Sequence, residues 1–76
     1  MSRRRNPVNF KKLPGSKWTA VQPVERQKHF AVLDWVRDDD GVPTGMIAVE
    51  AILTGTVRVM HWRELADPET WRIGWQ

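Results

Sequence analysis

The stretch His29-Phe30-Ala31-Val32-Leu33-Asp34-Trp35-Val36-Arg37 decides the fold class of this chain. It is rich in β-branched and aromatic residues, which favour a strand over a helix. Successive side chains of a strand alternate between its two faces. Alternation here places Ala31, Leu33 and Trp35 on one face, and Phe30, Val32 and Val36 on the other. Because both faces are largely apolar, we expect a central strand that is covered on two sides or strongly bent.

The next segments of the chain predict two hairpins. Asp38 to Pro43 is typical of a hairpin loop, with Asp40-Gly41 as the strongest turn pair. A strand is expected from Thr44 to Leu53, and Thr54-Gly55 is interpreted as a tight two-residue turn into a strand from Thr56 to Trp62. Alternation predicts one face of the strand from Thr44 that is formed by Ile47, Val49, Ala51 and Leu53. A two-residue turn would set Val49 opposite Met60 and Arg58 diagonally near Glu50.

The ends of the pattern complete the predicted domain, residues 17–76. A first strand covers Trp18 to Gln22, stops at Pro23, and is followed by the polar connection Glu25 to Lys28. After the last strand, Asp67-Pro68-Glu69-Thr70-Trp71 predicts a helical turn, with a helix from Trp62 to Ala66 as the alternative. We therefore expect a mainly β fold: a small antiparallel meander of four or five strands or an SH3-like barrel, with a short C-terminal helical turn.

Five tryptophans distinguish the composition of this 76-residue chain, which contains no cysteine. Without disulfides, so short a chain needs large apolar side chains to build its core. A buried aromatic side chain removes about 150–250 Å² from water, so the core is the favoured place for any single tryptophan. Trp18 and Trp35 lie in the middle of predicted strands and are expected there. The candidates for base stacking or partner binding are Trp62, Trp71 and Trp75.

The charge is distributed unevenly along the chain. Residues 1–17 contain six basic and no acidic side chains, whereas residues 18–76 contain six basic and nine acidic ones. We expect residues 1–16 to form a flexible basic arm, anchored through Phe10 or Leu13. Such an arm resembles the phosphate-binding arms of nucleic-acid proteins, and a solubilising tail is the alternative interpretation. The candidate nucleic-acid-binding residues are Arg3, Arg4, Arg5, Lys11, Lys12 and Lys17, extended by Arg63 and Arg72.

Other functional classes find little support in the sequence. The longest apolar stretch, residues 46–53, is interrupted by Glu50 and is far shorter than the ~20 residues of a membrane-spanning helix. Asp38-Asp39-Asp40 is interpreted as a solvated hairpin tip and not as a metal site, and His29 and His61 are isolated in the sequence. We therefore predict no catalytic residue, no metal ligand, no cofactor and no membrane association, and we expect a cytoplasmic protein that is not an enzyme.

Several segments together carry a resemblance that spans nearly the whole chain. They include Asn6 to Asn9, Lys11 to Leu13, Ser16 to Pro23, Lys28 to Phe30, Glu50-Ala51, Thr54-Gly55, Trp62 to Asp67, and Trp71 with Gly74-Trp75. With these segments the chain resembles a family of small bacterial tryptophan-rich proteins of uncharacterised function. The resemblance implies a bacterial cytoplasmic origin and a complete single domain, and it implies no activity, cofactor or site.

Three functional hypotheses follow. The leading one is a module that binds RNA or a ribonucleoprotein through the basic arm, with one exposed tryptophan as a stacking platform. The second is a protein-interaction module that binds a partner strand or peptide through its β edge and its tryptophans. The third is a small-molecule binder lined by indoles. Which tryptophans are exposed is the observation that separates them best.

Overall fold

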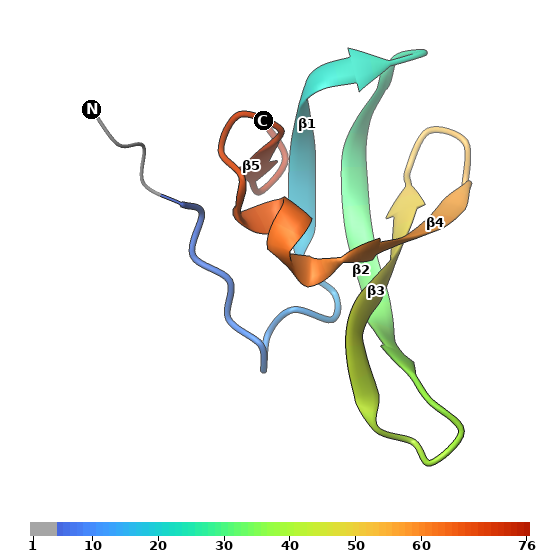
Figure 1. Cartoon of the computed structure of the whole chain (residues 1–76). Coiled ribbons are helices and arrows are strands. Elements are labelled where there is room, and N and C mark those ends of the chain that lie inside the picture. Colours follow the sequence, from blue (N-terminus) through green and yellow to red (C-terminus); the bar gives the residue numbers. More distant parts are fainter. Residues whose placement is uncertain (1–4) are drawn as a thin grey trace.

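A computed structural model of the chain describes residues 5–76, which build one antiparallel sheet (Figure 1). Its strands are β1 (Lys17–Val24), β2 (Gln27–Arg37), β3 (Pro43–Ala51), β4 (Val57–His61) and β5 (Trp71–Ile73), and a 3₁₀ helix, η1 (Trp62–Ala66), lies between β4 and β5. The order in the sheet is β4-β3-β2-β1-β5. The predicted antiparallel β fold is thereby confirmed in its meander form: β4 and β5 are the two edges of an open sheet.

The C-terminal helical turn forms at the alternative of the two predicted positions, Trp62–Ala66. The segment that follows it makes a single turn around Asp67, whose carboxylate accepts hydrogen bonds from the N–H of Glu69 and the hydroxyl of Thr70. The chain then pairs Trp71–Ile73 with β1. This fifth strand has three residues, which are too few for an alternating pattern to predict it.

The core lies on one face of the sheet, which we call the core face. β2, β3 and β4 contribute cross-strand pairs to it, such as Val32 opposite Val49 and Ile47 opposite Met60. Leu65 of η1 and Leu13 of the N-terminal segment cover these pairs and are themselves buried. In Figure 1, η1 and the N-terminal segment lie on the same side of the sheet. The buried hydrophobic residues are Leu13, Trp18, Phe30, Val32, Ile47, Val49, Ala51, Met60, Leu65, Ala66 and Trp71.

A β-bulge in β2 corrects the predicted alternation. Val32 pairs with Val49, but Asp34, and not Leu33, pairs with Ala48 of β3. The extra residue, Leu33, turns outward and is 46% exposed. Because a bulge adds one residue, every later side chain of β2 changes face. Trp35 therefore lies on the core face with Val32, and not on the opposite face with Ala31 and Leu33 as alternation predicted.

The β3–β4 hairpin has a longer loop than the predicted two-residue turn. β3 ends at Ala51 and β4 begins at Val57, and the N–H of Ala51 donates to the carbonyl of Thr56 across the loop. Val49 consequently pairs with Arg58, and the predicted pairing of Val49 with Met60 is wrong by two residues. A shift of two keeps every side chain on its face. The prediction of a shared face is right for Ile47, Val49 and Ala51, which lie on the core face, whereas Leu53 lies in the loop and is exposed.

The first hairpin also departs in detail from the prediction. β1 continues through Pro23 to Val24, and the connection to β2 consists of Glu25 and Arg26, both with positive φ. Positive φ at two consecutive residues is the conformation of a tight two-residue hairpin turn. Glycine, asparagine or aspartate usually mark such a turn, so Glu25-Arg26 gave no local signal.

The N-terminal segment packs more than its composition suggests. The side-chain amide of Asn6 donates to the carbonyls of Leu65 and Trp71, at 2.9 and 2.8 Å, and the N–H of Gly15 donates to the carbonyl of Val32. Leu13 is 2% exposed and is the anchor that the sequence proposed together with Phe10. Within residues 6–16, Asn6, Leu13 and Gly15 therefore join the N-terminal segment to η1 and the sheet, whereas the flexibility expected of residues 1–16 stays a prediction. Arg3 and Arg4 lie outside the described residues.

Candidate functional site

Three aromatic side chains gather where the N-terminal segment crosses the lower end of the core face, as oriented in Figure 1. The ring of Phe10 lies edge-on to Trp35, with 5.7 Å between centroids, and edge-on to Trp62, with 4.9 Å between centroids. Phe10 is 53% exposed, and both tryptophans are partly buried against the core. We call Phe10, Trp35 and Trp62 the aromatic face. It comes from three parts of the chain: the N-terminal segment, β2 and the start of η1.

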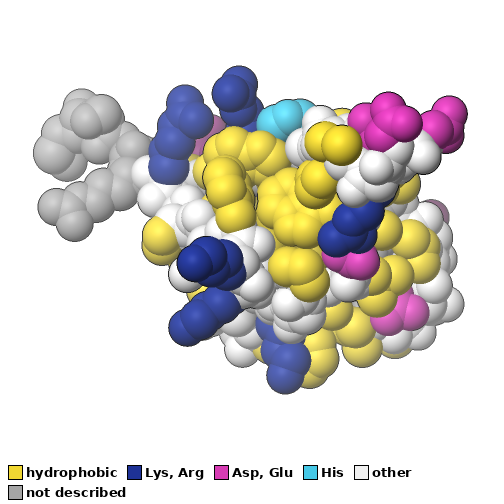
Figure 2. Space-filling model, turned by 90° about the horizontal axis from the view of Figure 1, so that it is seen from below, with side chains coloured by type: hydrophobic (Ala, Val, Ile, Leu, Met, Phe, Trp, Pro, Cys, Tyr) yellow, Lys and Arg dark blue, Asp and Glu magenta, His cyan; other side chains and the backbone are white. Residues whose placement is uncertain are grey.

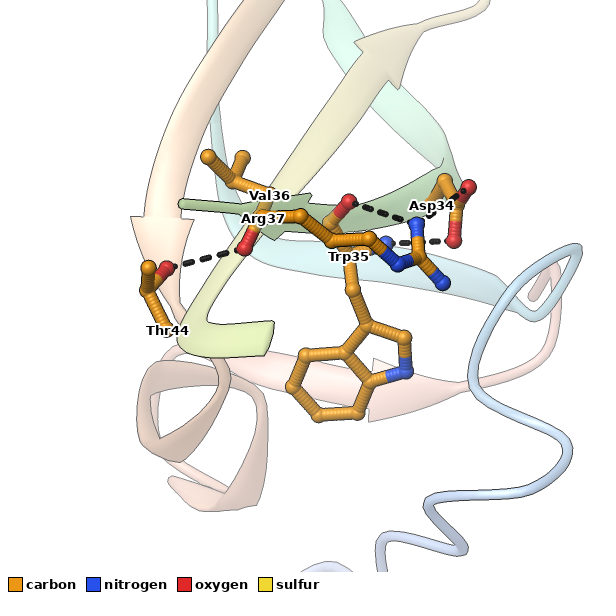
Figure 3. Close-up of polar contacts among 5 residues, drawn as sticks. All are labelled: Asp34, Trp35, Val36, Arg37 and Thr44. Carbon is orange, nitrogen blue, oxygen red and sulfur yellow. Dashed lines mark hydrogen bonds and ion pairs between the residues drawn. The ribbon is translucent and has the colours of Figure 1, made fainter. Parts of the chain in front are cut away.

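Trp35 is held by polar contacts just beyond the bulge (Figure 3). The Asp34 carboxylate accepts a 2.7 Å hydrogen bond from the N–H of Trp35 and a 3.1 Å bond from Nη1 of Arg37. These two contacts, the backbone one first, lower the pKa of Asp34 below its ordinary value. The Thr44 hydroxyl donates to the carbonyl of Val36 and ties the same stretch to β3. The contacts orient the backbone so that the Trp35 indole points toward the N-terminal segment.

Trp62 is positioned by the beginning of η1. Nδ1 of the His61 ring accepts a hydrogen bond from the N–H of Arg63 and so caps the helix. The other side of that ring lies against Gly45, where an added Cβ would be 3.0 Å from His61 Nε2. Gly45 also has φ of +90°, a conformation that other residues rarely adopt. The Arg63 guanidinium lies over the Trp62 ring, 5.8 Å from its centroid.

Phe10 is presented by a short turn that also carries two lysines. The Asn9 side-chain oxygen accepts hydrogen bonds from the N–H groups of Lys11 and Lys12, at 3.0 and 3.3 Å. Both lysine side chains are exposed. Figure 2, which views the molecule from below, shows hydrophobic side chains across the middle of this face and Lys and Arg side chains at several points around them. Acidic side chains gather at one corner of the same view.

The structure places the other predicted site residues elsewhere. Trp71 is 2% exposed and belongs to the core, so it does not offer the stacking surface that the sequence predicted. The reason is that a small sheet needs buried aromatic area for its core. Trp75 is 44% exposed, stacks on His29, and has Nζ of Lys17 4.8 Å from its ring. Arg72 pairs with Thr19, and this register directs it to the face opposite the core. Arg5 is exposed beside Asn6.

The aromatic face thus unites only part of the predicted set: Trp62, Arg63, Lys11 and Lys12. Phe10 and Trp35 were expected to serve as an anchor and as core. The position of Trp35 was missed because the sequence does not indicate the bulge at Leu33. The role of Phe10 was missed because it depends on a contact with Trp62, which is far away in the sequence. Half-exposed aromatic rings beside several cations are the arrangement with which proteins stack bases and neutralise phosphates.

Three further observations concern the acidic hairpin loop, metal ligands and membrane-spanning helices. The Asp38 carboxylate accepts hydrogen bonds from the N–H groups of Asp40 and Val42, both at 2.9 Å, and so closes its own loop. Within residues 5–76, no three His, Asp or Glu side chains are grouped as metal ligands. In the same part of the chain, no helix has the length and apolarity needed to cross a membrane.

Comparison with known proteins gives one match. The family model described as "Tryptophan-rich protein (DUF2389)" matches residues 16–76. Neither the curated proteins nor the solved structures contain a match to the chain. The match covers all of the sheet and η1, and it carries no statement of function.

Proposed function

We propose that this chain, which belongs to the tryptophan-rich protein family whose model it matches, is a non-enzymatic module that binds single-stranded RNA through its aromatic face. One observation carries the proposal: Phe10 and Trp62 form a partly exposed aromatic pair, with Arg63 over Trp62 and Lys11 and Lys12 on the adjoining turn. As a site of action we propose the bacterial cytoplasm, where RNA is abundant.

The aromatic part of the site favours unpaired bases. A base in a duplex exposes only its edge, whereas an unpaired base exposes a flat surface that stacks on aromatic rings. The edge-on contact of Phe10 with Trp62 leaves ring surface of Phe10 in solvent, since half of this side chain is exposed. Stacking of this kind contributes about 1–3 kcal/mol for each base and tolerates any base.

The basic part of the site supplies affinity for the phosphates. Lys11 and Lys12 are exposed next to Phe10, and Arg63 lies next to Trp62, so cations flank the aromatic pair on both sides. Each phosphate neutralised on a single strand releases condensed counterions, and binding weakens as salt rises, with a slope of about −0.7 per phosphate. Such contacts select a polyanion without selecting a sequence.

The test measures binding of a labelled oligouridine by fluorescence anisotropy at several salt concentrations. We expect Phe10→Ala to weaken binding about tenfold, because stacking is lost. We expect the double variant Lys11→Gln/Lys12→Gln to reduce the salt slope by about 1.4, because two phosphate contacts are lost. The matched control is Lys17→Gln/Arg72→Gln, which removes the same charge away from the aromatic face.

The control decides between a site and a general charge effect. If both double variants reduce the slope equally, RNA responds only to net charge and the aromatic face is not its site. If the unaltered chain does not bind at low salt, the proposal is wrong.

The second candidate function, a protein-interaction module, is favoured by the face opposite the core. Val57 and Val59 of the edge strand β4 are 49% and 56% exposed there, and Leu33 lies on the same side. A protein partner that is retained after nuclease treatment and lost with Val59→Glu would favour this function over RNA binding. Retention that Val59→Glu leaves unchanged would count against it.

A further inference from the structure

A pocket of about 410 Å³ opens at the upper end of the core face, between the β1–β2 hairpin, the start of β4 and the residues that precede β5. Phe30 of β2 and Trp71 of β5 form its floor and contact each other edge-on, with 5.0 Å between ring centroids. Arg58 of β4 and the amide side chains of Gln22 and Gln27 complete the wall. The volume lies within the range of about 300–1,000 Å³ found for small-molecule sites. We call it the Arg58 pocket.

Arg58 reaches this pocket because of the register of β4. It pairs with Val49, whose side chain is fully buried, so Arg58 lies on the core face although its own side chain is exposed. Its guanidinium carbon is 5.0 Å from the ring centroid of Phe30 and 5.8 Å from that of Trp71. A guanidinium close to aromatic rings is stabilised by the negative ring faces, and its N–H groups can still donate to an oxyanion.

The charge of Arg58 is not neutralised within the described part of the chain. Arg37 there forms an ion pair with Asp34, at 3.1 Å, whereas no carboxylate of residues 5–76 pairs with Arg58. A planar guanidinium presents a fork of donors that fits the two oxygens of a carboxylate or phosphate. The lining that Phe30 and Trp71 contribute next to it is apolar and suits an apolar group. Cation and floor together therefore define the chemistry of a ligand.

We propose that the Arg58 pocket binds a small organic anion, with its oxyanion on Arg58 and its apolar body against the pocket lining that Phe30 and Trp71 contribute. Gln22 and Gln27 offer neutral hydrogen-bonding groups to the remainder of the ligand. Glu69 also lines the pocket. The site is separate from the aromatic face, and the proposal stands whether or not RNA binds there.

The experiment is a two-dimensional NMR titration of the full chain with benzoate, phenyl phosphate and benzamide. These probes share a ring and differ in the group that meets Arg58: a carboxylate, a phosphate or a neutral amide. We expect benzoate or phenyl phosphate to shift the Trp71 indole N–H and the Arg58 Nε–H signals, with a dissociation constant in the millimolar range. We expect benzamide to bind about tenfold more weakly, because a charge-assisted hydrogen bond is lost. The stronger of the two anions identifies the oxyanion.

Arg58→Gln is the decisive variant, and Arg63→Gln is its matched control, because it removes the cation over Trp62 at the other end of the core face. We expect Arg58→Gln to abolish the preference for the anions and Arg63→Gln to leave it intact. Well-dispersed spectra of both variants show that the fold is retained. Equal binding of benzamide and the anions, anion binding that survives Arg58→Gln, or no shift with any probe would overturn the proposal.

Discussion

The aromatic face and the Arg58 pocket combine the same residue types at opposite ends of one core face, yet their aromatic rings are exposed to very different degrees. At the aromatic face, Phe10 is half exposed and its cations lie on a turn beside it and over Trp62. In the Arg58 pocket the rings of Phe30 and Trp71 are buried, and the cation above them is exposed. The comparison teaches that a tryptophan next to an arginine does not define a site by itself. Burial decides how much of each ring a ligand can reach, whereas the cations are exposed at both ends.

The largest expected difference between the two ends concerns the tryptophans themselves. Trp71→Ala removes a side chain that is 2% exposed, and we expect it to lower the free energy of unfolding by about 3–5 kcal/mol. Trp62 is only partly buried, and we expect Trp62→Ala to cost about 1–2 kcal/mol. Urea denaturation of both variants measures the difference. Equal costs would show that Trp62 belongs to the core as fully as Trp71 and would remove it from the candidate interface.

Gly45→Ala tests the packing of Gly45 against His61, which supports the aromatic face and not the Arg58 pocket. The added Cβ would lie 3.0 Å from Nε2 of His61 and would also occupy a backbone with φ of +90°. We expect a loss of about 2–3 kcal/mol, of which backbone strain alone is about 1 kcal/mol. Gly41→Ala is the control, because its φ is +80° but an added Cβ meets nothing within 4 Å. Similar unfolding midpoints for the two variants would mean that the His61 ring moves away from the added Cβ without a measurable loss of stability.

Asn6→Ala tests the connection between the two ends. The amide of Asn6 donates to the carbonyl of Leu65, in η1, and to that of Trp71, under the Arg58 pocket. Losing both bonds leaves two carbonyls without these donors, and we expect a cost of about 1–2 kcal/mol. Amide hydrogen exchange would then increase in η1 and β5 together. Faster exchange in only one of them would show that the two ends are stabilised independently.

The smallest expected effect is on the pH dependence of stability in the acid range, and it comes from Asp34. Its pKa is lowered by the hydrogen bond from the N–H of Trp35 and then by Arg37. Because the folded-state pKa is below the unfolded one, the contribution to stability is present above about pH 4 and is lost as pH falls through the folded pKa. We expect Asp34→Asn to lower stability slightly near neutral pH, where the ionised carboxylate contributes, and therefore to flatten the loss on the acid side. Urea midpoints across the acid range measure it, and an unchanged acid slope would contradict the assignment.

Much of the fold was predictable because strands and turns are local. The apolar alternation of residues 44–51 predicted that Ile47, Val49 and Ala51 share a face, and Asp40-Gly41 predicted the hairpin loop between β2 and β3. The amino-acid order also determined that six basic and no acidic side chains precede residue 18. These properties depend on side-chain period, turn chemistry and charge, which neighbouring residues set by themselves.

Both candidate sites, by contrast, were decided by the tertiary structure. One inserted residue, Leu33, moves Trp35 to the core face, and the longer β3–β4 loop sets Arg58 opposite Val49. Phe10 meets Trp62 in an N-terminal segment that the buried Leu13 and the hydrogen bonds of Asn6 hold against the rest of the fold. Bulges, loop lengths and docking contacts are selected by the total packing of the core, because a small sheet must bury whatever aromatic area it has. The sequence alone therefore determined a tryptophan-rich β domain with a basic N-terminus, and the tertiary structure decided which rings and cations meet.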